Sequence, residues 1–365
     1  MNLSDRALPG KRGREPVVSI LIPVYNAAPH LRRCLDSALG QTLRDIEVVC
    51  VDDGSTDGSP AILAEYAARD PRLRVIFQKN NGTLHARSEA ARIALGEYFL
   101  CLDADDCFRP SIVEQAVSVA RRLGVDVVEF SASIRCHGIF QRRRRWRWGS
   151  PNLGRMGKIL EQPALALEAV AGRISSLLWN KLVRREIFLA ADGSIPPEVR
   201  IKNFLGHEDE LFYILIFLHA RSYTAIPAIG CDYTIWPTSI SWQLQAFFPK
   251  HLATLDTLFL ALRTLHQIVP PSLHPHLFDH YARIVFDYTD QWERFTPAQR
   301  LLAWQWIVDG FHFSSAAHAF LVGRIFGSKK ILRQITANLL RRRPLSLFPG
   351  EWARNLLRFL FGKKD

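Results

Sequence analysis

Val17-Val18-Ser19-Ile20-Leu21-Ile22-Pro23-Val24-Tyr25-Asn26 is the stretch that decides the fold of this chain. The nearly continuous apolar run up to Val24 is typical of a strand buried on both faces of a parallel sheet. Tyr25 and Asn26 then make a turn, and apolar residues recur at helical spacing over 29–39. The sequence therefore predicts a strand, a turn and a helix in direct succession.

The same unit repeats outward from this stretch. Apolar runs alternate with helical spacing and the connections are short, which predicts the α/β fold class with a mostly parallel sheet covered by helices. The predicted strands are 17–24, 46–51, 73–78, 98–102, 125–130 and 223–233, and the predicted helices are 29–39, 59–68, 84–95, 111–123 and one that ends at about 220.

Polar turns follow three of the predicted strands, at Tyr25-Asn26, at Asp52-Asp53-Gly54-Ser55-Thr56-Asp57-Gly58-Ser59 and at Asp103-Ala104-Asp105-Asp106. Ligands of open α/β sheets bind beyond the carboxyl ends of the strands. We therefore expect the three turns to converge on one edge of the sheet and to form the functional site there.

The turn at Asp103-Ala104-Asp105-Asp106 carries three carboxylates within a short span. These groups repel one another unless a cation joins them, and hard cations such as Mg²⁺ and Mn²⁺ take oxygen ligands and accept bound phosphate. A solvated turn with a helix cap explains the residues equally well.

The turn that begins at Asp52 also has two explanations. Its Gly and Ser residues allow a ligand close to the backbone and its carboxylates can accept hydrogen bonds from a base or ribose, or the segment is an Asx-turn followed by an N-cap.

Taken together, these motifs resemble the inverting glycosyltransferases of family 2, which have the GT-A fold, a Rossmann-like fold that binds nucleotide-diphospho-sugars. That family opens with a buried strand ending in Pro-x-Tyr-Asn, followed by an Asp-Asp-Gly-Ser-x-Asp turn and an Asp-x-Asp metal motif, and all three occur here in this order. The resemblance is close over 16–110 and looser over 179–242. It is strongest to transferases of bacterial cell-surface polysaccharide synthesis.

The resemblance implies a role for each matching residue. Asp105 would hold Mn²⁺ or Mg²⁺ against the diphosphate of the donor, and Arg87 would brace carboxylates or phosphates. Ser88 stands where the family commonly has an asparagine, and His85 is explained at least as well by packing as by ligand binding. The implied donor-binding residues are Pro23, Tyr25, Asn26, Asp53, Arg87, Asp103 and Ala104.

Glu208 and Asp209 resemble the Glu-Asp motif of the family at the start of a helix, where the aspartate acts as the general base. The alternative is a pair of acids favoured by the helix dipole. Trp179, Lys181 and Glu208 are implied as contacts of the donor or acceptor. No Gln-x-x-Arg-Trp motif is present, which speaks against processive synthesis of the cellulose or hyaluronan type.

Length and composition suggest three regions within the 365 residues. We expect a flexible basic tail over 1–15, a GT-A domain over 16–245 and a helical C-terminal region over 246–365. The domain divides into a nucleotide-binding half, 16–110, and an acceptor half, 111–245. The six cysteines form no CxxC pair and are expected to be reduced and mostly buried.

The net charge of +12 favours anionic partners without choosing among them. Two basic-aromatic segments, 142–148 and 341–364, could bind an anionic membrane as an amphipathic surface or pack on the core with a solvated rim, and the sequence favours neither. The N-terminal tail lacks the apolar core of a signal peptide and no run is long enough to span a bilayer. We therefore expect a cytoplasmic location, peripheral on the inner face of the membrane if these segments bind it.

The sequence predicts a metal-dependent transferase that uses a nucleotide-diphosphate sugar, with UDP as the carrier that the resemblance favours. Its acceptor would be a glycan or a lipid-linked glycan of a cell-surface polymer. One alternative is a degenerate transferase that only binds a nucleotide or glycan. The other is a nucleic-acid binder, but no recognition motif of that class appears, so nucleic acid is not an expected partner.

Overall fold

The computed structural model describes residues 15–136, 157–200, 204, 206–236, 248–289, 299, 302–303 and 307. The chain divides into one compact unit over 1–284, which contains all the predicted site residues, and a second over 285–365. Two of the sequence-based predictions concern segments outside the described residues. They are the tail up to residue 14 and the basic-aromatic segments 142–148 and 341–364, so membrane contact stays a prediction.

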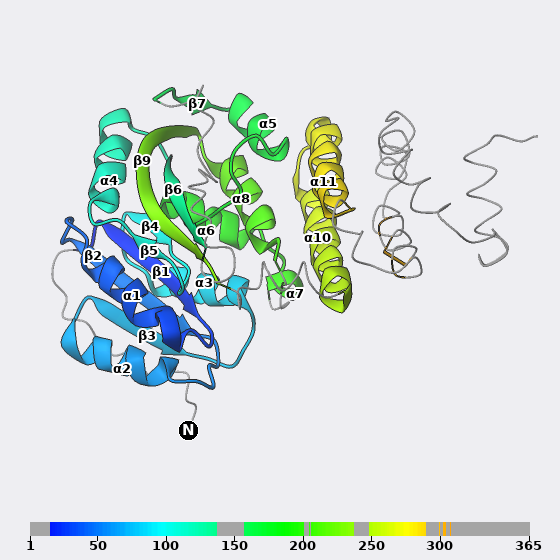
Figure 1. Cartoon of the computed structure of the whole chain (residues 1–365). Helices are drawn as coiled ribbons and strands as arrows, with labels where there is room; N and C mark the ends of the chain where they lie inside the picture. Colours follow the sequence, from blue (N-terminus) through cyan, green and yellow to red (C-terminus); the bar gives the residue numbers. More distant parts are fainter. Residues whose placement is uncertain are drawn as a thin grey trace, which may run out of the picture. The chain divides into compact units, whose positions relative to one another are not determined.

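From residue 18 to residue 101 the elements alternate between strand and helix as the sequence pattern predicts (Figure 1). In chain order they are β1 (Val18–Val24), α1 (Ala28–Leu39), β2 (Ile46–Asp52), α2 (Ser59–Arg69), β3 (Leu73–Phe77), α3 (Thr83–Ile93), β4 (Tyr98–Cys101), β5 (Cys107–Phe108), α4 (Ile112–Leu123), β6 (Val127–Cys136), β7 (Leu160–Glu161), α5 (Ala164–Val170), β8 (Lys181–Arg184), α6 (Arg185–Gly193), α7 (Pro197–Arg200), α8 (Glu208–His219), β9 (Ser222–Ile235), α10 (Phe248–Ile268), the 3₁₀ turn η3 (Pro271–Leu273) and α11 (His274–Thr289).

The described strands form one mixed sheet in the order β3-β2-β1-β4-β8-β6-β9-β5, with β7 paired to β9. The pairs β1–β2, β1–β4, β2–β3 and β6–β9 are parallel and contain most of the paired residues. Strand β8 lies antiparallel between β4 and β6. In the parallel part, Val24 pairs with Asp52, so the turns that follow β1 and β2 leave the sheet at the same edge.

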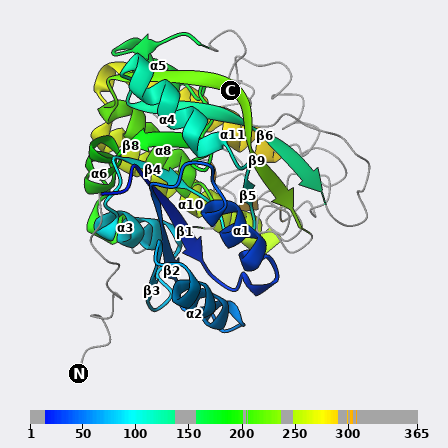
Figure 2. The same cartoon turned by 90° about the vertical axis from the view of Figure 1, so that its left-hand side faces the viewer.

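Helices cover both faces of this sheet (Figure 2). Alternate residues of β1, from Val18 to Val24, pack with apolar residues of α1, α2 and α4 in one core cluster. On the other face α3 packs against β1 and β2, and α6 packs against β4 and β8. Because each central strand is buried on both sides, its sequence is a continuous apolar run rather than an alternating one, and the predicted fold class is confirmed.

Beyond α4 the sequence predicts the elements less completely. The strand predicted over 125–130 is the longer β6, and the structure adds β5, β7, α5, β8 and α7, which the periodicity did not indicate. Helix α10 belongs to the predicted C-terminal helical region and packs against α8. A boundary between residues 245 and 246 stays a prediction.

The described residues also bear on the expected state of the cysteines and on membrane-spanning helices. Cys34, Cys50, Cys101 and Cys231 are buried free thiols and Cys107 is a half-buried one, in agreement with the expected reduced state. Among the helices of the described segments, none combines the length and apolar character needed to cross a bilayer.

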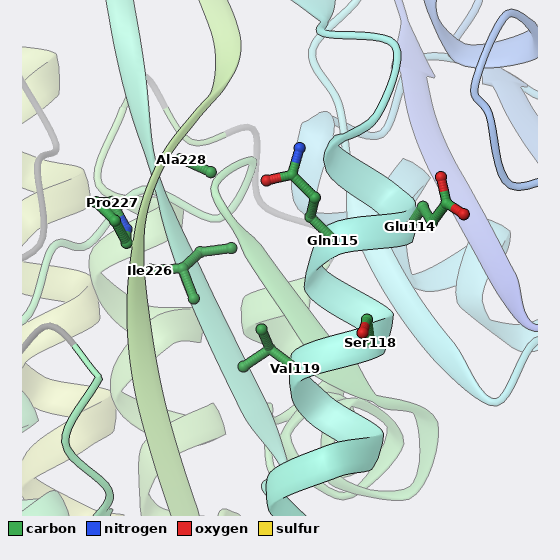
Figure 3. A pocket seen from close by; sticks show the side chains of 7 residues that line it. All are labelled: Glu114, Gln115, Ser118, Val119, Ile226, Pro227 and Ala228. Atoms are coloured by element: carbon green, nitrogen blue, oxygen red, sulfur yellow. The ribbon is translucent and has the colours of Figure 1, made fainter.

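An open groove of about 630 Å³ lies between α4 and β9 (Figure 3). Its walls are the side chains Glu114, Gln115, Ser118, Val119, Ile226, Pro227 and Ala228. None of the residues that the sequence nominates for chemistry lines this groove, so the candidate site lies elsewhere, at the carboxyl edge of the parallel strands.

Candidate active site

The turns after β1 and β2 are bonded to each other, as the sequence predicts for neighbouring parallel strands. The Asn26 amide donates to the Ser55 hydroxyl at 2.9 Å, and the Thr56 amide donates to the Asn26 side-chain oxygen at 2.8 Å. Asn26 has a φ of 49°, the left-handed conformation that asparagine tolerates better than most residues. The neighbouring Tyr25 side chain is 53% exposed, so this turn presents an aromatic ring to solvent at the edge of the sheet.

Asp53, one of the predicted donor-binding residues, is buried, and its carboxylate already accepts hydrogen bonds from three donors. The amides of Asn81 and Gly82 donate to it at 2.9 and 2.8 Å, and the Gln78 side chain donates at 2.6 Å. Gln78 also contacts His85 at 3.1 Å, which gives that histidine a supporting place beside Asp53. By contrast, the buried neighbour Asp52 uses one oxygen for the turn, and its Oδ2 has no hydrogen-bond partner among the described residues.

The predicted metal loop leaves β4 and begins a tight turn, in which the Asp106 amide donates to the Asp103 carbonyl at 3.0 Å. The Thr234 amide of β9 donates to Asp106 Oδ1 at 2.9 Å. Asp106 is fully buried, and within the described part of the chain its Oδ2 has no partner. Burial and the nearby Asp103 raise the pKa of Asp105 to about 6, and burial raises the pKa of Asp106 well above its usual range. The loop therefore concentrates negative charge that a cation would stabilise.

Arg87 on α3 joins the predicted metal loop to Asp209, the predicted general base. Its Nη2 atom lies 2.8 Å from Asp103 Oδ1 and its Nη1 atom lies 2.6 Å from Asp209 Oδ1. The guanidinium is 3% exposed, whereas the side chains of Asp103 and Asp209 are 31% and 22% exposed. The cation therefore lies below the two carboxylates and leaves their outer edges accessible, as expected of a group that orients them.

The first turn of α8 places three consecutive acids in three different surroundings. Asp209 binds Arg87, and Glu210 Oε2 lies 3.1 Å from His280 of α11. Glu208 is the third, and burial together with Asp209 raises its pKa to about 7. Burial also raises the pKa of Asp209, while Arg87 opposes the shift. The chain enters this turn through His207 in the left-handed conformation, with a φ of 67°.

Trp179 and Lys181, the predicted donor or acceptor contacts, lie in the interior rather than on the surface of the site. Trp179 is 2% exposed and stacks on Tyr233 with ring centroids 5.5 Å apart. Lys181 is 1% exposed, and its ammonium donates to the Leu177 carbonyl at 2.7 Å and lies 4.0 Å from a Glu129 carboxylate oxygen. The carboxylate of Asp209 also accepts a hydrogen bond from the Leu178 amide, so this segment contacts the predicted general base from the interior.

Replacing Lys181 by methionine is expected to lower the free energy of unfolding by about 3–5 kcal/mol, because the variant leaves the Glu129 carboxylate buried without this cation. Urea denaturation measures the loss. The double variant Lys181→Met, Glu129→Gln is expected to recover part of it, and Lys158→Met, at an exposed lysine, serves as the matched control. Equal stability of Lys181→Met and the wild type would contradict the argument.

Ser88 and Arg33 are two residues whose contacts the sequence pattern did not reveal. Ser88, which stands where the family commonly has an asparagine, donates to Asp192 Oδ1, and Arg200 binds the other oxygen of that carboxylate at 2.6 Å. This bond ties α3, which carries Arg87, to α6. Arg33 on α1 donates to the Asp105 carbonyl at 2.7 Å. Neither contact has a local sequence signal, since the partners lie far apart in the chain.

The structure places most of the predicted site residues around one edge of the sheet, where Arg87 links the metal loop to α8.

Comparison with known proteins agrees with this arrangement. Residues 19–180 match the family model "Glycosyl transferase family 2". The chain is 30% identical over 245 residues to the putative glycosyltransferase EpsH of Bacillus subtilis, and the alignment spans 66% of this chain and 68% of EpsH. The chain belongs to glycosyltransferase family 2. It is also 33% identical over 209 residues to EpsJ of the same organism, covering 56% of this chain and 57% of EpsJ.

The family 2 chain thus spans little more than half the length of EpsJ. Its fold matches two solved transferases. The TarS fragment 1–349 of S. aureus superposes with a TM-score of 0.61 at 17% identity, covering 88% of this chain and 90% of TarS. The mannosyltransferase PcManGT of Pyrobaculum calidifontis superposes with a TM-score of 0.51 at 19% identity, covering 96% of this chain and 89% of that one. These likenesses confirm the GT-A fold that the sequence predicted.

Proposed function

We propose that this family 2 glycosyltransferase transfers a hexosyl or N-acetylhexosaminyl group, with inversion, from a nucleotide-diphosphate sugar to a hydroxyl of a glycan. The observation that carries the proposal is the Asp103–Arg87–Asp209 network. The guanidinium of Arg87 pairs with both Asp103, a carboxylate of the predicted donor site, and Asp209, the predicted general base. A sugar carbon held between these two carboxylates would be open to attack from the side opposite its diphosphate.

In this scheme Asp209 acts as the general base. Its carboxylate accepts the proton of the acceptor hydroxyl while that oxygen bonds to the anomeric carbon. The bond between the anomeric carbon and the diphosphate oxygen breaks, and its electron pair leaves with the nucleoside diphosphate. One displacement of this kind inverts the anomeric centre. Arg87 and the Leu178 amide keep the base oriented and favour its charged form.

The aspartates of the metal loop fit a divalent cation that is completed by phosphate. Within the described segments, no group of three or more His, Cys, Asp or Glu side chains is arranged to hold an ion alone. Mg²⁺ sites commonly use one or two carboxylates together with substrate phosphates. Burial and the nearby Asp103 raise the pKa of Asp105 to about 6, so a cation beside Asp105 would stabilise its charged form. Asp105, with Asp103 beside it, would hold the ion, which when bound stabilises negative charge on the departing diphosphate.

The donor is proposed to carry UDP and the acceptor to be a glycan or lipid-linked glycan of a cell-surface polymer. TarS has been solved with UDP and with UDP-GlcNAc, and PcManGT with GDP-Man and Mn²⁺. These complexes support a nucleotide-sugar donor and leave UDP and GDP as the two carriers to compare. The resemblance to transferases of polysaccharide synthesis supports the acceptor class.

Calorimetric titration with UDP, GDP, ADP and CDP, each with and without Mn²⁺, tests the proposal directly. We expect metal-dependent binding of one nucleotide in the wild type and its loss in Asp105→Ala. A panel of sugar donors for that nucleotide, with product detected by mass spectrometry, then tests transfer. Binding without transfer to any acceptor would support a degenerate binding protein, and no binding of any nucleotide would overturn the proposal.

The acidic limb of the pH–rate profile is expected to lie unusually high for a carboxylate. Glu208 and Asp209 both have raised pKa values, that of Glu208 about 7, and they titrate as an interacting pair. Because Asp209 must be deprotonated to act as the base and its pKa is raised, activity should begin to fall at a higher pH than it would for an ordinary aspartate. Glu208→Gln removes one negative charge and should move this limb to lower pH. A limb near pH 4 in the wild type would show that neither carboxylate is perturbed during turnover.

A further inference from the structure

Arg33 is an exposed arginine of α1 that lies beside the metal loop without an ion-pair partner among the described residues. Its neighbour in the sequence, Arg32, pairs with Glu65 of α2, as surface arginines commonly do. Arg33 instead directs its Nη2 atom to the Asp105 backbone carbonyl at 2.7 Å and to the Thr234 hydroxyl at 3.1 Å. The guanidinium of Arg33 therefore contacts the loop through its backbone and forms no ion pair with the carboxylates of the loop.

An aromatic contact holds the guanidinium in this position. Its central carbon lies 5.7 Å from the ring centroid of Trp236, within the range of a cation–π interaction. The same tryptophan ring stacks on His30, one turn before Arg33 on α1, with centroids 4.1 Å apart. His30, Trp236 and the Thr234 hydroxyl thus position a long side chain that would otherwise sample many rotamers.

Only part of the hydrogen-bonding capacity of the Arg33 guanidinium is used. A guanidinium carries five N–H donors in a planar fork. Both recorded hydrogen bonds start from Nη2, and within the described segments Nε and Nη1 donate to no residue. The preoriented guanidinium has open donors and lies next to several carboxylates, which is the chemistry of an anion-binding group. An anion bound there would face Arg33 and the loop that is proposed to hold the divalent cation.

We propose that Arg33 binds the diphosphate of the nucleotide donor and stabilises it as the leaving group. This inference rests on the proposed function, since it assigns a further contact of the same donor site. The diphosphate gains negative charge as its bond to the sugar breaks, and Arg33 offers hydrogen bonds to that charge without a change in its own protonation state. Arg33 is thereby distinguished from Arg87, which is buried and already paired with two carboxylates.

Calorimetry with UDP and with UMP, both in saturating Mn²⁺, separates this function from a structural one. In Arg33→Ala the Kd of UDP should rise about tenfold or more, equivalent to about 1.4 kcal/mol or more, while the Kd of UMP changes less than about twofold. Arg33→Lys should recover part of the loss, because lysine keeps the charge but not the fork. Arg32→Ala is the matched control and should bind both nucleotides as the wild type does. GDP and GMP replace the uridine pair if the wild type prefers guanine.

Each remaining outcome overturns the inference in a distinguishable way. Equal weakening of UDP and UMP in Arg33→Ala would show that the arginine only clamps α1 to the loop. Unchanged UDP binding in that variant would show that the diphosphate does not meet Arg33, with the proposed function intact. A wild type that binds neither nucleotide pair would remove the proposed function and this inference together.

Discussion

Asp209→Asn is expected to lower kcat by about 10²–10⁴-fold, the usual contribution of a general base. The asparagine oxygen can still accept a hydrogen bond from Arg87, so the arrangement around α3 and α8 should survive while proton acceptance is lost. Donor binding should therefore stay near the wild-type value, because the variant leaves the metal loop unchanged. Steady-state kinetics with the donor found by calorimetry measures the first quantity, and nucleotide titration measures the second.

Asp70→Asn is the matched control for this substitution. Asp70 is also an aspartate paired with an arginine, Arg72, at 2.7 Å, but it lies at the end of α2. The control should retain wild-type kcat, which separates loss of the base from loss of an ion pair. If Asp209→Asn keeps full turnover, Asp209 is not the base and the assignment of α8 fails.

Arg87→Ala is expected to produce the largest combined loss, in both stability and activity. Removing the guanidinium leaves two carboxylates close together without their cation, and breaking a buried pair in this way costs about 3–5 kcal/mol. Without the positive charge the pKa of Asp209 should rise further, so a larger share of the base is protonated at neutral pH. Thermal unfolding and the pH dependence of kcat/KM measure the two effects separately.

Arg92→Ala provides the comparison on the same helix. Arg92 is 64% exposed and pairs with Glu89 at 3.0 Å, and an exposed pair of this kind contributes only about 0–1 kcal/mol. Arg87→Lys covers the case in which Arg87→Ala does not fold, because lysine keeps the charge but reaches one carboxylate at a time. An Arg87→Ala protein as stable and as active as Arg92→Ala would refute the bridging role.

The N-terminal half of the fold could be predicted because its information is local. Each parallel strand is a short apolar run, and each following helix has a repeating apolar face, so the alternation shows in the sequence. Strand β8 could not be predicted in this way. It begins with Lys181, whose burial depends on Glu129 of β6, and no local pattern announces a partner that the tertiary fold brings into contact.

In the candidate site too, residues in local motifs could be predicted, whereas contacts that depend on tertiary packing could not. Asp103, Asp105 and Asp209 stand in recognisable motifs at strand and helix ends, and Arg87 indeed meets two of them. Motif matching could not show that the Asp53 carboxylate is taken up by the loop after β3, or that Trp179 is buried. Both facts depend on packing. The sequence did not single out Arg33 because an arginine on a helix is common, and its position becomes informative only through its contacts with the metal loop and with Thr234 of β9.

The first turn of α8 does not tolerate an inserted or deleted residue without changing which acid meets which partner. Glu208, Asp209 and Glu210 reach different partners because successive helical residues point about 100° apart. An inserted or deleted residue within this turn would rotate the acids around the helix axis, bringing the wrong carboxylate to Arg87 and moving another away from His280. Anyone who grafts a new acceptor-binding segment between β8 and α8 should therefore preserve the count from His207 onward and vary the length before it.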